Sequence, residues 1–338
     1  MKKDINWQEL DFSYMETDYI VITECHNGVW EKPVVRKETT FSLHIAASCL
    51  HYGQAAFEGL KAFTQKDGSV KIFRPTENIK RMADTALRLV MAEPPEDIYM
   101  EAIRLLIANN REWIPPYGTG ASLYIRPLLI GTTPRVGVKP ADDFLLAILC
   151  MPVGPYYKNG FYPVKAYVQE KYDRAAPLGV GNVKAAGNYA AGMLSDLDCK
   201  VRGYPICLYL DSATHTYVDE FGTSNFIGIT KENCFVTPDS NSILPSITNM
   251  SLQQIAHDFG MEVQRRPIAF DELPNLKEVG ACGTAAVITP IYSITRDETV
   301  YTFGNEETVG ETLTRLFKEI QGIQYGEIDD RHNWMVAV

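Results

Sequence analysis

The chain has 338 residues, of which 46% are hydrophobic and 22% are charged, and its formal net charge at pH 7 is −10. This length exceeds what most single hydrophobic cores hold, so we expect a soluble protein of two domains. The acidic balance, with lysines and arginines scattered along the chain, argues against nucleic acid or an anionic membrane as a partner. No run approaches the roughly 20 apolar residues of a membrane helix, and the N-terminus has no apolar signal core, so we expect a cytoplasmic protein.

Apolar periodicity in the first half of the chain predicts strands mixed with two helices. Thr76 is the candidate N-cap of the first helix, and Pro115-Pro116 end the second. The predicted elements, in chain order, are strands with turns over 41–73, a helix from Thr76 to about Val90, a helix over 97–113, and buried strands over 123–130 and 144–153.

The second half follows a turn-rich stretch that begins at Gly154. This stretch predicts a domain over 1–153, a linker over 154–164 and a second domain over 165–338. The predicted elements are strands over 164–168, 204–210 and 217–230, and helices over 188–201, from about 248, and over 307–320. Strands and helices follow no regular βαβ rhythm, and no Gly-x-Gly-x-x-Gly stands between a strand and a helix, which argues against a dinucleotide-binding fold.

The cysteines and histidines give no sign of a metal site. The seven cysteines are widely spaced, without a Cys-x-x-Cys pair, and the six histidines do not cluster near them. We therefore predict reduced thiols, with neither a disulfide framework nor a bound metal.

Lys184 is the most informative single residue, because 179–189 contains no other charge and is rich in glycine and alanine. Small residues let a bulky group approach the backbone. Apolar surroundings favour the neutral amine of a lysine, and a neutral amine attacks an aldehyde to form a Schiff base. The alternative is a surface lysine in a glycine-rich loop.

Three later segments carry groups that would complement an aldehyde cofactor. In 217–226, Asp219 or Glu220 offers a carboxylate that could hold a pyridine nitrogen protonated; the alternative is a solvated strand end. In 244–252, a helix begins and offers backbone N–H groups to an anion. In 281–286, a turn of small residues offers further N–H groups and a hydroxyl; the alternative is a plain tight turn, and Cys282 is expected to be packed rather than reactive.

Taken in order, these segments resemble the branched-chain amino acid aminotransferases, which are fold-type IV pyridoxal phosphate enzymes. The resemblance covers the chain from about residue 20 to residue 326. The matching motifs lie at 52–61, 74–82, 123–127, 181–189, 220–223, 244–245 and 283–285.

The resemblance implies an α/β (α+β) fold of two domains, with pyridoxal 5′-phosphate at the domain interface. It implies a ping-pong transamination between L-leucine, L-isoleucine or L-valine and 2-oxoglutarate, which yields branched-chain 2-oxo acids and L-glutamate. The partners would be these small amino acids and 2-oxo acids, and the chain would form a homodimer or a larger homo-oligomer.

The resemblance also assigns roles to individual residues. Lys184 would be the Schiff-base lysine and the proton shuttle, and Glu220 rather than Asp219 would hold the pyridine nitrogen. The other expected cofactor ligands are Arg81, Tyr189, Ile247, Thr248 and Thr284. The expected substrate-binding residues are Tyr52, Phe57, Tyr124, Arg126, Tyr156, Thr223, Thr284 and Ala285.

Two questions stay open at the level of sequence. Arg126 either pairs with an acidic neighbour in a structural role or meets the side-chain carboxylate of glutamate. Three other functions compete with the branched-chain interpretation: a D-amino acid transaminase, a lyase acting on aminodeoxychorismate, and a non-catalytic binding protein of the same fold.

Overall fold

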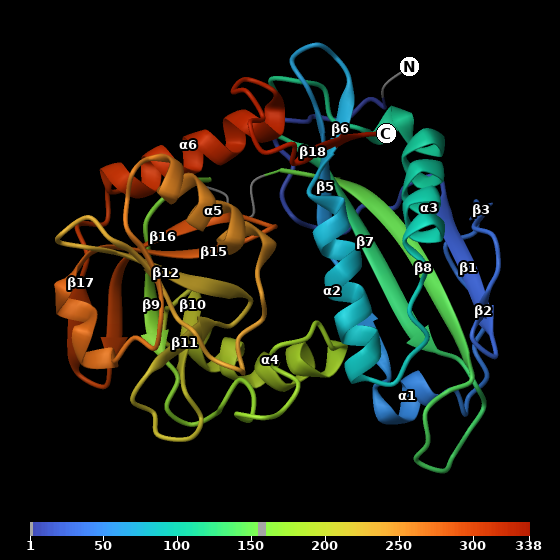
Figure 1. Cartoon of the computed structure of the whole chain (residues 1–338), viewed down its shortest axis with the longest axis horizontal. Coiled ribbons are helices and arrows are strands. Elements are labelled where there is room, and N and C mark those ends of the chain that lie inside the picture. Colours follow the sequence, from blue (N-terminus) through green and yellow to red (C-terminus); the bar gives the residue numbers. More distant parts are fainter. Residues whose placement is uncertain (1–2, 155–159) are drawn as a thin grey trace. The chain divides into compact units, whose positions relative to one another are not determined.

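The computed structural model describes residues 3–154 and 160–338, which form two compact units (Figure 1). Unit 1 contains the described residues up to 154, the short segment Val183–Gly187 and the C-terminal segment Ile323–Val338. Unit 2 contains residues 160–182 and Asn188–Gly322. The segment with Lys184 thus belongs to unit 1, although its neighbours on both sides belong to unit 2. The predicted domain ranges stay a prediction, and part of the predicted linker, 155–159, lies outside the described residues.

Unit 1 is built on an antiparallel sheet with the strand order β18-β6-β5-β7-β8-β1-β2, to which β3 and β4 add at β1 and β7. Apolar residues of α2 and α3, such as Met82 and Ile103, pack with strand residues such as Leu60 and Ile125 in the main core. The elements are β1 (Ile20–His26), β2 (Val29–Trp30), β3 (Val34–Arg36), α1 (Ser48–Tyr52), β4 (Ala55–Phe57), β5 (Leu60–Thr64), β6 (Val70–Phe73), α2 (Pro75–Arg88), α3 (Glu96–Asn109), the 3₁₀ turn η1 (Arg111–Trp113), β7 (Ser122–Gly131), β8 (Asp143–Val153) and β18 (Met335–Ala337).

Helix α2 begins one residue before the predicted N-cap. Arg74 is the N-cap, in a left-handed conformation with φ 47°, and Pro75 is the first helical residue. Proline is favoured there because the first N–H of a helix has no intrahelical acceptor and the ring presets φ. The prediction of Thr76 as N-cap is therefore wrong. The helix carries Arg81 and Thr85 on one face, since residues four apart lie above one another.

Unit 2 is a barrel of mixed strand directions. Its strand order is β11-β10-β9-β16-β15-β12-β13-β14, and a further pairing of β11 with β12 closes the strands from β11 to β12 into a ring. The interior holds an apolar core that includes Leu208, Phe226 and Ile294. The elements are β9 (Val164–Val168), α4 (Ala186–Val201), β10 (Ile206–Leu210), β11 (Val218–Phe221), β12 (Ser224–Thr230), β13 (Phe235–Thr237), α5 (Ile247–Asp258), β14 (Val263–Arg265), the 3₁₀ segment η2 (Phe270–Asn275), β15 (Leu276–Gly283), β16 (Val287–Arg296), β17 (Thr299–Thr302) and α6 (Glu311–Tyr325).

Among the described residues, none of the helices is both long enough and apolar enough to span a bilayer. The same residues contain no group of three or more His, Cys, Asp or Glu side chains that could hold a metal ion.

Cys199 and Cys207 form a disulfide in unit 2, so the prediction of reduced thiols is wrong for this pair. Cys199 lies near the end of α4 and Cys207 in β10, and both side chains are buried. The turn between the helix and the strand brings their Cα atoms to 6.2 Å, within the range that a disulfide bridges. A separation of eight along the chain matched no disulfide motif, and only the tertiary path of the chain brings the two thiols together.

Thiol counting tests this pair. We expect protein purified without reductant to expose five reactive thiols per chain after denaturation, because only the five free cysteines react, and all seven after reduction. The control is Cys199→Ser, which should release Cys207 and give the same count of thiols with and without reductant. Seven thiols in the unreduced wild-type protein would contradict the disulfide.

Candidate active site

Two backbone hydrogen bonds fix the position of Lys184 within unit 1. The Phe57 N–H donates to the Lys184 carbonyl at 3.2 Å, and the Lys184 N–H donates to the Thr85 hydroxyl at 3.0 Å. Ala185, the next residue, pairs with Ala56 in an isolated β-bridge. The lysine is therefore attached to β4 on one side and to α2 on the other, and it is half-buried rather than held in a solvated loop.

The side chain of Lys184 lies beside an aromatic ring and a buried acid. Its Nζ is 4.8 Å from the centre of the Phe57 ring, and the charge of Glu58 acts on it. A charged group therefore lies near the amine, whereas the sequence indicated apolar neighbours. In this arrangement Glu58 and Phe57 both help to set the electrostatics of the lysine.

Arg81 and Glu58 form a buried, bidentate ion pair. Arg81 Nε and Nη2 donate to the two Glu58 carboxylate oxygens at 2.7 and 2.9 Å. Burial raises the pKa of the Glu58 carboxyl, but Arg81 and Lys184 together lower it more, and the pKa lies below its ordinary value. Arg81 is thus held in one orientation by two parallel bonds. Its predicted role as a phosphate ligand stays a prediction.

Arg126 projects from β7 next to two predicted substrate residues. Its Nε and Nη2 donate to the Tyr124 hydroxyl at 3.2 and 2.7 Å, and its guanidinium lies 4.8 Å from the Phe57 ring centre. Within residues 3–154 and 160–338, the structure shows no ion pair between Arg126 and a carboxylate. The structural alternative, an arginine paired with an acidic neighbour, therefore receives no support from the described residues. Phe57, Tyr124, Arg126 and Lys184 form one connected group.

The remaining predicted residues of this unit are less informative. Tyr52 ends α1, is exposed, and donates its hydroxyl to the Val136 carbonyl. Tyr156 lies outside the described residues. The structure does not place Tyr52 with the Lys184 group.

Glu220 is the centre of the predicted site in unit 2. It lies in β11 and is only 3% exposed. Arg174 forms an ion pair with one carboxylate oxygen, to which the Leu244 N–H also donates at 2.9 Å, and the Asn225 amide donates to the other at 3.0 Å. Burial raises the pKa of Glu220 to about 7 although Arg174 opposes it. The carboxyl is thus poised between its neutral and charged forms near neutral pH.

A chain of buried amides connects Glu220 to the start of α5. Asn225 accepts a hydrogen bond from the Asn249 amide at 3.1 Å, and Asn249 also donates to the Thr237 hydroxyl at 2.8 Å. Asn249 stands in the first turn of α5, where Ser246 caps the helix by accepting its N–H. The two residues before Asn249, Ile247 and Thr248, are buried and carry N–H groups that the helix itself leaves unused. The network fixes these N–H groups relative to the carboxylate.

The other predicted residues of unit 2 gather at the same end of the barrel. The strand registers place Glu220, Asn225 and Cys282 in one row across β11, β12 and β15. The two turns that follow this row carry the predicted residues Thr223, Thr284 and Ala285. These turns are adjacent, since a Cβ on Gly283 would lie 3.8 Å from the Thr223 carbonyl oxygen.

Cys282 is packed as expected. The thiol is fully buried, and its burial, together with the charge of Glu220, raises its pKa. A thiol with a raised pKa is a poor nucleophile at neutral pH, so the chemistry of the site belongs to its other groups.

The glycine-rich loop before Lys184 makes a close backbone contact in unit 2. A Cβ on Gly181 would collide with the Ser242 carbonyl oxygen, which explains why the loop needs glycine there. Asn188 donates to the Val180 carbonyl at 2.8 Å, and the adjacent Tyr189 is half-buried in the first turns of α4. The small residues of this loop were expected to let a bulky group approach the backbone. At Gly181 it is the backbone of Ser242 that makes the close approach.

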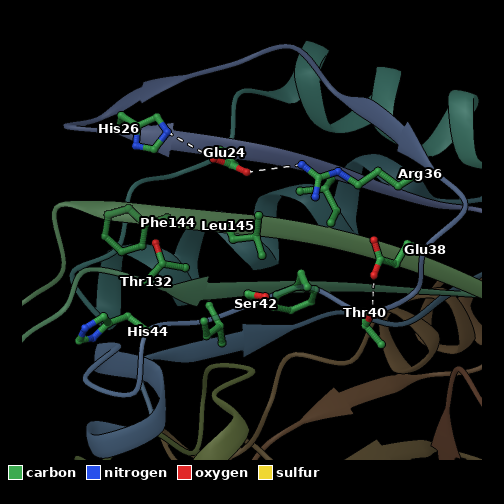
Figure 2. Close-up of a pocket in the computed structure, with 13 residues that line it drawn as sticks. Glu24, His26, Arg36, Glu38, Thr40, Ser42, His44, Thr132, Phe144 and Leu145 are labelled. Atoms are coloured by element: carbon green, nitrogen blue, oxygen red, sulfur yellow. Dashed lines mark hydrogen bonds and ion pairs between the residues drawn. The ribbon is translucent and has the colours of Figure 1, made fainter.

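Unit 1 also has a cavity of about 560 Å³ (Figure 2). Its lining includes Glu24, Arg36 and Glu38, and Arg36 pairs with Glu24 at 3.7 Å. Thr40 donates to Glu38 at 3.1 Å. None of the described lining residues belongs to the predicted site, so cavity size does not locate it here.

The residues present fit pyridoxal phosphate, the cofactor that the resemblance implies. The cofactor needs an amine for its aldehyde, a carboxylate for its ring nitrogen and N–H donors for its phosphate. Unit 1 contains such an amine in Lys184, and unit 2 contains a buried carboxylate in Glu220 and unused N–H groups at the start of α5. In the described part of the chain, Arg174 Nη1 is a buried nitrogen without a hydrogen-bond partner, as expected of a polar site completed by a ligand.

Sequence reasoning missed four polar residues that support the predicted ones: Glu58, Arg174, Asn225 and Asn249. Asn225 and Asn249 stand inside apolar segments already singled out, and a buried amide among apolar residues signals a hydrogen-bond network. Glu58 follows Phe57 directly within the first motif. No local pattern marks Arg174, because its partner lies 46 residues further along the chain.

The raised pKa of Glu220 predicts a pH dependence of stability in protein freed of cofactor. Between its ordinary pKa of 4.5 and about 7, the folded state binds more protons at this carboxyl than the unfolded state does, so its contribution to stability falls as pH rises. The contribution of this carboxyl to the free energy of unfolding falls by about 3 kcal/mol over this pH range, at about 1.4 kcal/mol per pKa unit. Denaturant unfolding at pH 4.5 and 7.5 should show it as a difference between wild type and Glu220→Gln. Equal pH slopes in both proteins would contradict the raised pKa.

Comparison with known proteins identifies the family. Residues 55–294 match the family model of class IV aminotransferases. The chain is 44% identical to a branched-chain-amino-acid aminotransferase of Haemophilus influenzae over 342 aligned positions, which cover 99% of each chain.

Solved structures agree with the sequence comparison. The branched-chain amino acid aminotransferase of Escherichia coli has a TM-score of 0.79 at 27% identity, with 95% of this chain and 99% of that chain covered. The T.th. branched-chain amino acid aminotransferase, solved with pyridoxamine 5′-phosphate, has a TM-score of 0.79 at 25% identity, with 96% and 99% covered. The chain therefore belongs to the class IV aminotransferases, which depend on pyridoxal phosphate, and within them to the branched-chain-amino-acid aminotransferases.

Proposed function

We propose that the protein transfers the amino group of L-leucine, L-isoleucine or L-valine to 2-oxoglutarate, acting as a cytoplasmic homodimer. The observation that carries the proposal is the fixed position of Lys184, whose backbone is bonded to β4 and α2 beside the Arg81–Glu58 pair. A reactive amine held in this way is what the family's chemistry requires. The full-length identity to a branched-chain enzyme supports the choice of substrates.

Lys184 and Glu220 are proposed to carry the chemical step. Pyridoxal phosphate, when bound, withdraws electrons from the Cα atom of the amino acid. Lys184 Nζ would take the proton from Cα and deliver it to the C4′ carbon of the cofactor, which is general base and then general acid catalysis by one group. Glu220 accepts a hydrogen bond from the protonated ring nitrogen and so holds positive charge where electrons accumulate.

The remaining cofactor contacts are proposed from the residues' chemistry. Arg81 and the N–H groups of Ile247 and Thr248 bind the phosphate, since helix N-termini and guanidinium groups are both suited to anions. Tyr189 donates its phenol to the ring oxygen, and the Thr284 turn contributes to the phosphate side. The buried network from Glu220 to Asn249 supports these assignments. It fixes the Glu220 carboxylate and the first N–H groups of α5 relative to each other.

Phe57, Tyr124 and Arg126 are proposed to accept two unlike side chains in turn. The aromatic rings offer apolar contact to a leucine side chain. A glutamate carboxylate replaces the Tyr124 hydroxyl as the partner of Arg126, because a charge-assisted hydrogen bond is stronger than one to a neutral phenol. With a leucine side chain, Arg126 keeps its bonds to Tyr124. The backbones of Thr223 and Ala285 are proposed to hold the substrate's α-carboxylate.

Removal of Lys184 tests the catalytic assignment. Lys184→Ala should lower turnover of L-leucine with 2-oxoglutarate by ~10³-fold or more, since both the covalent anchor and the proton carrier are lost. The internal control is the exposed Lys200→Ala in α4, which should keep normal turnover. A substrate panel with L- and D-amino acids accompanies both assays. Near-normal activity of Lys184→Ala would contradict the mechanism, and a preference for D-substrates would favour a D-amino acid transaminase.

Arg126→Ala separates the two halves of the reaction. It should slow the half-reaction with 2-oxoglutarate by about 10- to 100-fold, the effect of losing one charged hydrogen bond, and the leucine half-reaction much less. Single-turnover absorbance changes measure each half separately. Tyr124→Phe, which removes only the phenol, should affect 2-oxoglutarate less than Arg126→Ala does. Equal losses in both half-reactions would assign Arg126 a structural role.

A further inference from the structure

Arg174 joins two parts of the site in unit 2 through one nitrogen. Its Nη2 forms the ion pair with Glu220 and also donates to the Gly181 carbonyl at 3.0 Å. The side chain is 12% exposed, and Glu220 is 4% exposed at its side chain. The arginine therefore lies buried between the barrel strand β11 and the glycine-rich loop that leads to Lys184.

We propose that Arg174 is a positioning residue that fixes the Glu220 carboxylate against the backbone of the loop 179–182. This proposal rests on the proposed role of Glu220 at the ring nitrogen. It gives a role to a residue that takes no part in the proposed chemical step. It also predicts that removal of the guanidinium weakens the binding of pyridoxal phosphate.

The first consequence concerns the charge of Glu220. The groups that act on this carboxyl are the Arg174 guanidinium, the Leu244 N–H, the Asn225 amide and the carboxylate of Asp219, with the Cys282 thiol on the neighbouring strand. Burial raises the pKa of Glu220 most, Arg174 is the strongest opposing group, and Asp219 adds a smaller increase. Without Arg174, the carboxyl would keep its proton at neutral pH and lose its attraction for a ring N–H.

The second consequence concerns the position of the loop. Gly181 is packed against the Ser242 backbone, and the segment it touches continues to Leu244, whose N–H also binds Glu220. Arg174 completes this arrangement by holding the Gly181 carbonyl. Asn188 holds the preceding carbonyl, of Val180. The loop 179–182 and the Glu220 carboxylate are thus connected by the Arg174 side chain and by the contact of Gly181 with Ser242.

An arginine is better suited than a lysine to bind the Glu220 carboxylate and the Gly181 carbonyl at the same time. One guanidinium nitrogen carries two N–H groups in a fixed plane, so it can donate to a carboxylate and a carbonyl at once. A lysine would supply the charge but not the planar arrangement. The two substitutions therefore separate the effect of charge from the effect of position.

The experiment compares Arg174→Met and Arg174→Lys with Glu220→Gln and with Lys171→Met, an exposed neighbour that loses the same charge. The first readout is the dissociation constant of pyridoxal phosphate from the full-length protein, followed by absorbance. The second is the titration midpoint of Glu220 in infrared difference spectra, in which its carboxyl band is identified by its loss in Glu220→Gln. Thermal unfolding of each variant is recorded in parallel.

We expect Arg174→Met to raise the Glu220 midpoint by about 1 to 3 units and to weaken cofactor binding by about 10- to 100-fold. Arg174→Lys should keep the midpoint within about one unit of wild type and still weaken binding several-fold. Lys171→Met should change neither. In the double variant with Glu220→Gln, Arg174→Met should add little, because both changes remove one interaction.

An unchanged midpoint and unchanged affinity in Arg174→Met, alongside weakened binding in Glu220→Gln, would overturn the proposal. Normal affinity in Glu220→Gln would instead refute the role of Glu220 at the ring nitrogen, and the infrared midpoint would still decide for or against Arg174. If Arg174→Met does not fold, Arg174→Lys decides: weakened cofactor binding supports the proposal, and wild-type affinity contradicts it.

Discussion

The burial of the Glu220 carboxylate is the constraint on which the site in unit 2 depends. A charged carboxylate out of water is costly unless donors surround it. Here the donors come from three separate segments: the Arg174 side chain, the Leu244 backbone and the Asn225 amide. Each of these donors lowers the pKa of the buried carboxyl, so its ionisation near neutral pH depends on the loop before Lys184 and on the segment that leads into α5.

Unit 1 holds in one position the main chain of Lys184, the residue proposed to carry the chemical step. Backbone bonds to Phe57 and Thr85 fix the main chain of Lys184, and the Arg81–Glu58 pair fixes the charges beside it. Because Phe57 also lies against Arg126, the Lys184 amine and the residue proposed to select the substrate share one aromatic neighbour.

The sequence predicted those features that depend on local patterns. The strands around 123–130 and 144–153 appear as β7 and β8, and α4 and α5 begin within two residues of their predicted starts, because apolar periodicity and helix capping act over a few residues. The order of the motifs along the chain was enough to indicate the family. The sequence did not predict contacts between residues that only the tertiary path of the chain brings together. These are the ion pair of Arg174 with Glu220, the disulfide of Cys199 with Cys207, and the position of Glu58 beside Lys184.

The covalent link between Lys184 and pyridoxal phosphate is tested most directly by borohydride reduction of the purified enzyme, followed by peptide mass mapping. Reduction makes the imine bond permanent, so the modified lysine can be read from the peptides. We predict the pyridoxyl mass on the peptide that contains Lys184 and on no other peptide. The same mass on a different lysine, or on none, would contradict the assignment of Lys184.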